Sequence, residues 1–267
     1  NPSAISSNSA ILVSLALAIR HTGLDPASIP SNAADNGPRI KSGVTKRWRC
    51  ARVALPLALA LILCFARIMP VRTLFATNFY EADIAAPDLL QELEESCRLF
   101  AREDGAGKAW SRAHGYRGYT SYASLDDLPD RDPAFHDLKR LLDKHVKAFA
   151  KACHFDLAKP LKLDSLWVNV LKPGGTHSGH IHPHSIVSGT FYVAVPPGSG
   201  ALKLEDPRLA MLMAAPGRSE DAPESLQPFI YAEPAAGRIF LWESWLRHEV
   251  MPNAGKDERI SISFNYR

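Results

Sequence analysis

LWVNVLKPGGTHSGHIHPHSIVSGTFYVAV, residues 166–195, places four histidines within eight residues, between two segments with strand patterns. The aliphatic residues at 166, 168 and 170 alternate with the residues at 167, 169 and 171, which is the period-two pattern of a half-buried strand. Pro173 and the two glycines after it predict a turn, and residues 190–195 are rich in β-forming side chains. The histidines are therefore predicted to lie between two strands.

Two of these histidines have the spacing of metal ligands on an extended chain. His180 and His182 are separated by one residue, so on an extended backbone both side chains point to the same face. Two imidazoles hold a divalent metal weakly without a third protein ligand, and His248, in the distant segment WESWLRHEVMPN, supplies one. We predict a metal site from these three histidines, and we expect His177 and His184 at the surface or behind the ligands.

A candidate anion clamp follows His248 in the sequence. Residues 259–265, RISISFN, predict a strand that carries Arg259 and Ser261 on the same face. A guanidinium binds a carboxylate through two parallel hydrogen bonds, and a neighbouring hydroxyl adds another. An arginine on an alternating strand more often faces solvent, so the burial of Arg259 decides between a clamp and an ordinary surface residue.

Composition and charge separate the first quarter of the chain from the rest. The 267 residues are 46% hydrophobic, enough for a sizeable core, and the net charge is +3. Residues 1–68 hold eight basic and two acidic residues, a charge of +6, which leaves −3 for residues 69–267. The basic isoelectric point therefore gives no indication of nucleic-acid binding by the second part.

Residues 1–68 are predicted to be a disordered leader with a short apolar segment. Residues 1–50 have no periodicity, and the apolar run of fourteen residues at 53–66 follows a basic cluster at 46–52. That run has the size of a signal-peptide core and is shorter than the about 20 residues of a membrane span. Because the first methionine is Met69, we interpret the leader as upstream sequence outside the native protein, with an export signal or membrane anchor as the alternative.

Cysteine usage favours a reducing compartment. Cys50, Cys64, Cys97 and Cys153 are widely spaced and form neither a CxxC motif nor a disulfide framework. We therefore expect a cytoplasmic protein without firm membrane association. It would instead be exported or membrane-anchored if residues 46–66 act as a signal.

The remaining patterns predict a mainly β fold with flanking helices. Residues 87–103 read as an amphipathic helix, a second helix starts at Asp132 and Pro133 and ends at Lys159, and residues 114–122 read as a loop or edge strand near the site. The predicted strands are residues 71–79, 166–171, 190–195, 201–205, 229–231, 238–242, 246–250 and 258–265. About eight short strands with two helices packed outside indicate a small β-barrel or jelly roll.

Several segments together resemble a known family, the iron(II)- and 2-oxoglutarate-dependent oxygenases, and within it a little-characterised bacterial and phage group. The segments are WVNVLKPGG (167–175), HIHPHSIVSGTFYV (180–193), LEDPR (204–208), WLRHEVMPN (245–253) and RISISFN (259–265). The resemblance covers roughly residues 70–267 and is strongest after Leu166. It implies a double-stranded β-helix domain over residues 69–267, with His180, His182 and His248 at iron.

The resemblance also implies the cofactors and their binding residues. Arg259 and Ser261 would hold the distal carboxylate of 2-oxoglutarate, and iron, 2-oxoglutarate and O2 would together hydroxylate an unknown small-molecule or peptide substrate, with release of succinate and CO2. Further pocket candidates are Asn169 and Tyr192 beside the cosubstrate, and Trp167, Trp242 and Arg208 beside the substrate.

One position departs from the family pattern. The usual motif is His-x-Asp/Glu with a distal histidine, whereas this chain has His182 at the carboxylate position. Either three histidines bind the metal, or His182 stands off and two suffice. Glu205 and Asp206 are candidate substitutes for the carboxylate.

Two other classes of protein share parts of this pattern. A cupin-type metalloprotein, an isomerase, dioxygenase or small-molecule binder without 2-oxoglutarate, has HxH after a glycine such as Gly174 and a later histidine. The glutamate that such a protein carries soon after HxH is replaced here by Ile186 and Val187. A non-catalytic sensor that keeps the barrel is the other class. Arg259 and Ser261 discriminate, because only the oxygenase requires them.

Overall fold

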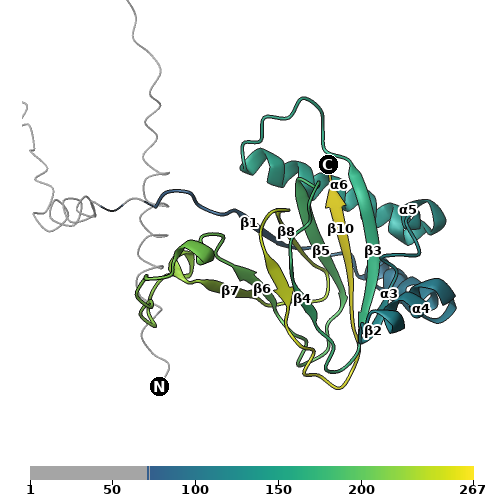
Figure 1. Ribbon diagram of the computed structural model, residues 1–267. Helices are drawn as coiled ribbons and strands as arrows, with labels where there is room; N and C mark the ends of the chain where they lie inside the picture. Colours follow the sequence, from purple (N-terminus) through teal and green to yellow (C-terminus); the bar gives the residue numbers. More distant parts are fainter. Residues whose placement is uncertain (1–70, 72) are drawn as a thin grey trace, which may run out of the picture. The chain divides into compact units, whose positions relative to one another are not determined.

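The computed structural model describes residues 71 and 73–267, and there it shows strands in two antiparallel sheets with helices beside them (Figure 1). The predicted leader, its apolar segment at 53–66 and the domain boundary at residue 69 lie outside the described residues. The strands are β1 (Phe79–Asp83), β2 (Gly118–Thr120), β3 (Leu163–Leu171), β4 (His177–His180), β5 (Val187–Ala194), β6 (Leu202–Glu205), β7 (Phe229–Ala232), β8 (Arg238–Glu243), β9 (His248–Val250) and β10 (Arg259–Tyr266). The α-helices are α3 (Pro87–Glu103), α4 (Gly105–Ala113), α5 (Leu128–Arg131) and α6 (Pro133–Ala152).

The sheets interleave segments from distant parts of the chain. The larger sheet has the order β1-β8-β5-β10-β3-β2, and the smaller has the order β4-β9-β6-β7. Every pairing is antiparallel, and β10 lies between β3 and β5 in the middle of the larger sheet. This topology is the mainly β, double-stranded β-helix architecture that the sequence predicts.

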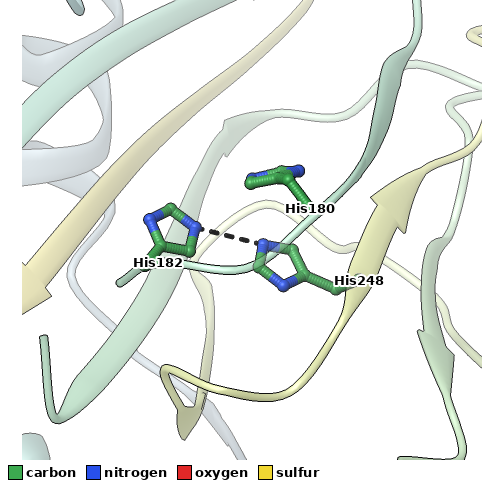
Figure 2. A group of neighbouring side chains, drawn as sticks. All are labelled: His180, His182 and His248. Carbon is green, nitrogen blue, oxygen red and sulfur yellow. Dashed lines mark hydrogen bonds between the residues drawn. The ribbon is translucent and has the colours of Figure 1, made fainter. Parts of the chain in front are cut away.

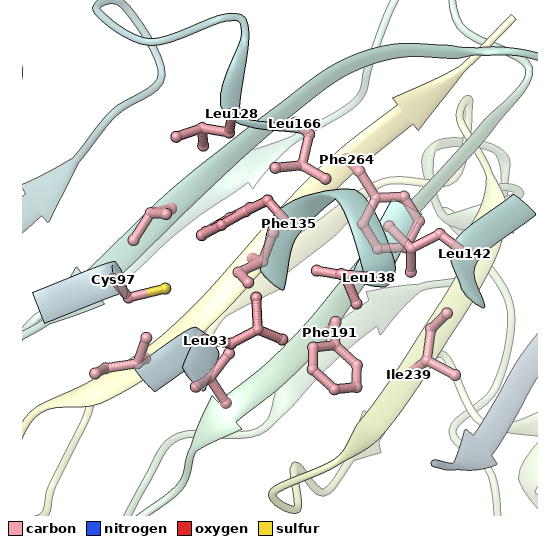
Figure 3. Packing of buried hydrophobic residues seen from close by; sticks show 14 of the residues in the cluster. Leu93, Cys97, Leu128, Phe135, Leu138, Leu142, Leu166, Phe191, Ile239 and Phe264 are labelled. Atoms are coloured by element: carbon pink, nitrogen blue, oxygen red, sulfur yellow. The ribbon is translucent and has the colours of Figure 1, made fainter. Parts of the chain in front are cut away.

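Helices α3 and α6 cover one face of the larger sheet and form the main core with it (Figure 3). Phe135, Leu138 and Leu142 of α6 pack in one cluster with Phe191 of β5 and Phe264 of β10, and all five are almost fully buried. Burying such a side chain contributes about 1.5–3 kcal/mol relative to leaving it exposed. Because side chains alternate along a strand, the residues between those of the core point to the opposite face of the sheet.

The caps explain where the helices begin and end. Asp132 accepts a hydrogen bond from the backbone N–H of Ala134 at 2.8 Å, and Pro133 occupies the first turn, so α6 starts where predicted. It ends at Ala152, seven residues before the predicted end at Lys159, because His154 takes a left-handed φ of 55°. Helix α3 has the bounds that its apolar face predicts.

Two local predictions were wrong. A strand was predicted at residues 71–79, but the observed strand, β1, covers residues 79–83, which pair with β8. Helix α4 was missed because its sequence begins GAG, although Asp104 caps it by accepting from the N–H of Gly107 at 2.9 Å. In the described part of the chain, no helix combines the length and the apolar character that a membrane span needs.

Candidate active site

Three imidazoles meet at one end of the smaller sheet (Figure 2). His180, the last residue of β4, pairs directly opposite His248, the first residue of β9. His182 follows two residues later, and its backbone N–H donates to the carbonyl of Ser244 at 3.0 Å. One ring nitrogen from each histidine lies within 4.8 Å of the other two. The strand pairing therefore brings together side chains that are 66 to 68 positions apart in the sequence.

Backbone carbonyls orient two of these rings. Nδ1 of His180 lies 2.7 Å from the carbonyl oxygen of Ser178, and Nδ1 of His248 lies 2.9 Å from that of Leu246. A carbonyl oxygen only accepts, so each Nδ1 carries the proton and each Nε2 keeps a free lone pair. Burial lowers the pKa of His248 to about 3 and that of His182 to about 4, and it also lowers the pKa of His180. Neutral rings with a free Nε2 are the form in which histidine binds metals.

The spacing of two ring nitrogens fits a shared ion. Nε2 of His182 and Nε2 of His248 lie 3.2 Å apart. Two nitrogens that each lie about 2.1 Å from one ion, at an angle between about 90° and 109°, are about 3.0–3.4 Å apart. The observed separation therefore suits a divalent metal as well as it suits a hydrogen bond between the rings.

The histidines border a cavity whose walls come from both sheets. Six residues that the sequence indicated for the cosubstrate or the substrate line this cavity: Trp167, Asn169, Tyr192, Trp242, Arg259 and Ser261. Arg208 does not. Its exposed side chain pairs with Asp206 at 2.8 Å and borders a separate groove beside Phe79 and Leu204. Leu204 of the LEDPR segment pairs opposite His248, but the structure does not bring Arg208 to the cavity beside the histidines.

Arg259 is a buried cation without an acidic partner among the described residues. Its side chain is 3% exposed, its Nη1 donates to the carbonyl of Gly200 at 3.1 Å, and its guanidinium lies 5.6 Å from the centre of the Tyr192 ring. Two buried side-chain atoms have no hydrogen-bond partner in the described part of the chain, Nε of Arg259 and Nε1 of Trp242. Both residues line this cavity. Since unpaired buried donors are costly, the cavity suits a ligand with acceptor oxygens.

Three other polar side chains of the cavity, Asn169, Tyr192 and Ser261, differ in their hydrogen bonds and their surroundings. Asn169 accepts from the Thr120 hydroxyl at 2.9 Å and donates to Ser263 at 3.1 Å, so most of its hydrogen-bonding capacity is used. Burial raises the pKa of Tyr192 to about 12, which keeps its phenol neutral. Ser261 is 3% exposed and lines the cavity on the same face of β10 as Arg259.

The structure adds residues to the cavity that the sequence did not indicate. Tyr116, His177 and Ser263 also line it. Ser263 follows from the alternation that places Ser261, so the sequence carried its signal. His177 was expected at the surface or behind the ligands, and its ring lies against that of His180 with centroids 4.5 Å apart, where burial lowers its pKa to about 4. His184 is exposed, as expected.

The candidate carboxylate substitutes lie elsewhere. Glu205 pairs with Arg247 at 3.3 Å and Asp206 pairs with Arg208 at 2.8 Å, and neither borders the cavity. Among the described residues, the lining of the cavity contains no aspartate or glutamate. The structure therefore contradicts the substitution and leaves His182 beside the other two imidazoles.

Comparisons with known proteins agree with this geometry. Residues 165–265 match the sequence profile of the family described as "Putative 2OG-Fe(II) oxygenase", a range that contains the three histidines, Arg259 and Ser261. No curated protein is similar enough to this chain to count as a match.

Solved structures share the fold at low sequence identity. A prolyl-4-hydroxylase from Pseudomonas putida is 18% identical, with a TM-score of 0.51 over 79% of this chain and 100% of that chain. The non-heme alpha ketoglutarate dependent carbocyclase SnoK from nogalamycin biosynthesis is 13% identical, with a TM-score of 0.51 over 72% of this chain and 79% of that chain. The epimerase SnoN from the same biosynthesis is 14% identical, with a TM-score of 0.50 over 79% and 83%. The chain thus has the double-stranded β-helix fold of these structures, and its residues 165–265 are similar to the 2OG-Fe(II) oxygenase family.

Proposed function

We propose that this protein is an Fe(II)- and 2-oxoglutarate-dependent oxygenase that hydroxylates its substrate and releases succinate and CO2. The observation that carries the proposal is the buried, acid-free guanidinium of Arg259 in the same cavity as three neutral imidazoles. A metal accounts for the imidazoles, and a carboxylate accounts for the guanidinium. 2-Oxoglutarate is a ligand that offers both a metal-chelating end and a distal carboxylate.

In this proposal His180, His182 and His248 hold the iron. The carbonyls of Ser178 and Leu246 fix the tautomers of His180 and His248, so that their Nε2 lone pairs are ready before the metal arrives. Iron and 2-oxoglutarate, when bound, supply the activation of O2 that hydroxylation needs. Three neutral ligands leave the full double positive charge of the iron for the dianionic cosubstrate to balance.

Arg259 would bind the distal carboxylate, with Ser261 adding a hydrogen bond. The ring of Tyr192 flanks the guanidinium and helps to keep water from it. The bond from Nη1 to Gly200 fixes the direction of the side chain and leaves Nε without a partner inside the protein. Arg259 is therefore already oriented, so little side-chain entropy is lost on binding.

A cupin-type metalloprotein that does not use 2-oxoglutarate is the alternative. It explains the three imidazoles equally well, but it gives no reason for a buried guanidinium without an acidic partner among the described residues. The unpaired Nε of Arg259 therefore favours the oxygenase.

The test uses the full chain with Fe(II), 2-oxoglutarate and O2, and it measures succinate. We expect succinate to form without any added substrate, at the slow rate of uncoupled turnover, and to be lost in His248→Ala and in Arg259→Met. Arg140→Met, which removes an arginine with a 70% exposed side chain, is the matched control and should keep the wild-type rate. Metal binding without succinate formation would favour the cupin alternative.

A further inference from the structure

A second hollow, a cleft of about 640 Å³, adjoins the histidines on the side of β2 and β3. Its lining is Trp110, Tyr116, Thr120, Tyr122, Asp164, Ser165, Trp167, His177, His180, Ile181, His182, Pro183, Ser185 and Asn265. Tyr116, Trp167, His177, His180 and His182 also line the cavity that contains Arg259. The cleft and the inner cavity therefore share a wall at the candidate metal ligands.

A continuous series of aromatic rings forms one wall of the cleft. Trp110 of α4 and Tyr122 have ring centroids 6.0 Å apart, and Tyr122 and Trp167 of β3 are 5.3 Å apart in an edge-to-face arrangement. The ring of Trp167 is in turn 5.9 Å from that of His182. Tyr122 is 61% exposed, whereas Trp167 is only 6% exposed. The aromatic wall thus runs from the surface to a candidate metal ligand.

The cleft carries almost no free charge. Its lining contains no lysine or arginine among the described residues, and its only carboxylate is that of Asp164. That carboxylate is paired with Arg267 at 2.8 Å. Besides the histidines and the polar atoms of its aromatic side chains, the cleft has hydroxyls and an amide, from Thr120, Ser165, Ser185 and Asn265.

We propose that this cleft is the substrate site, and that the substrate presents a neutral ring with flat apolar faces and hydrogen-bonding groups at its edge. Aromatic faces hold such a ring by dispersion and apolar burial, and the hydroxyls bind its polar edge. A cation finds no free acid here and would approach a positive metal, and an anion finds no free lysine or arginine. The delivery of this ring to the reacting centre rests on the proposed function, but its binding does not.

A matched set of small probes tests the inference on the full chain without iron or 2-oxoglutarate. The probes are cyclohexanol, cyclohexylammonium, cyclohexanecarboxylate and hexan-1-ol, which differ in charge or in ring closure at a constant number of ring or chain carbons. Saturation-transfer NMR measures the affinity of each. We expect cyclohexanol to bind more tightly than each of the other three, by about three- to tenfold. Equal or tighter binding of either charged ring, or of hexan-1-ol, would overturn the inference.

Paired substitutions locate the binding. Trp110→Ala and Tyr122→Ala should each weaken cyclohexanol binding by about three- to tenfold, the contribution of an aromatic contact. Their controls are Trp245→Ala and Tyr231→Ala, which remove exposed aromatic side chains outside this cleft. A loss of binding in the control variants equal to that in the cleft variants would contradict the assignment.

Failure of this inference can be told apart from failure of the proposed function. Selective cyclohexanol binding in a protein that forms no succinate from 2-oxoglutarate would retain the cleft as a ring-binding site and reject the oxygenase. Succinate formation without selective cyclohexanol binding would reject the neutral-ring substrate alone.

Discussion

The two faces of strand β10 have opposite roles. Ile260, Ile262 and Phe264 point toward the helices and are fully buried in the main core. Arg259, Ser261 and Ser263, which alternate with them, line the cavity beside the three imidazoles. One central strand therefore joins the most apolar part of the molecule to its most polar buried part.

The comparison teaches that stability and binding are separable on the same strand. The apolar face stabilises the fold, because its side chains leave water on folding. The polar face does not, because a buried guanidinium without an acidic partner pays for its desolvation until an anion arrives. Substitutions on the two faces should therefore affect different measurements.

The largest effect is expected on the apolar face. Phe264→Ala should lower the free energy of unfolding by about 3–5 kcal/mol, because it leaves a cavity in the main core. Denaturant unfolding measures this loss, and Phe75→Ala, at a side chain that is 91% exposed, should change it by less than about 0.5 kcal/mol. Equal effects at Phe75 and Phe264 would mean that the helix-covered face is not the core.

The polar face should show the reverse behaviour. Arg259→Met should weaken 2-oxoglutarate binding by about thirtyfold or more, or at least about 2 kcal/mol, because the carboxylate loses its charged partner. The free energy of unfolding of the ligand-free protein should stay the same or rise, since a buried unpaired charge is removed. Calorimetric titration and denaturant unfolding measure the two quantities, and a variant that loses stability but keeps its affinity would refute the clamp.

Two substitutions of His182 test whether this residue binds the metal. His182→Ala should weaken binding of a divalent metal by at least about tenfold, whereas His182→Asp, which restores the usual His-x-Asp pattern, should largely retain it. Titration with Zn(II) or Fe(II) under nitrogen gives both affinities. If His182→Ala binds metal as tightly as the wild type, His182 stands off and two histidines suffice.

The smallest effect is expected at Ser261. Ser261→Ala should weaken 2-oxoglutarate binding by about 0.5–1.5 kcal/mol, the contribution of one neutral hydrogen bond. The control is Ser263→Ala, because the Ser263 hydroxyl already bonds to Asn169 at 3.1 Å. The same titration serves for both, and a larger loss at Ser263 than at Ser261 would exchange their roles.

The sequence predicted this division well where alternation alone decides it. The pattern RISISFN placed Ile260 and Arg259 on opposite faces, because the period of a strand is two. The HxH spacing and the distant His248 were likewise enough to predict which imidazoles meet, since antiparallel pairing of β4 with β9 is the only further requirement.

Other features depend on contacts that no local pattern contains. The exact place of His177 depends on the pairing of β4 with β9, which shifts between His177 and His180, and both residues line the cavity. Arg208 lies outside the cavity, and its side chain bonds to Asp206 two residues before it. The aromatic cleft joins α4, β3 and the loops after β2 and β4. The sequence placed residues 114–122 near the site, but it gives no sign that α4 lies beside them.

Calorimetric titration of 2-oxoglutarate into the full chain under nitrogen, with and without Fe(II), tests most directly whether the imidazoles and Arg259 form one site. We expect one molecule of 2-oxoglutarate to bind per chain when iron is present, and much weaker binding when it is absent. Equal affinity with and without iron, or no binding in either case, would contradict a shared site for the metal and the carboxylate.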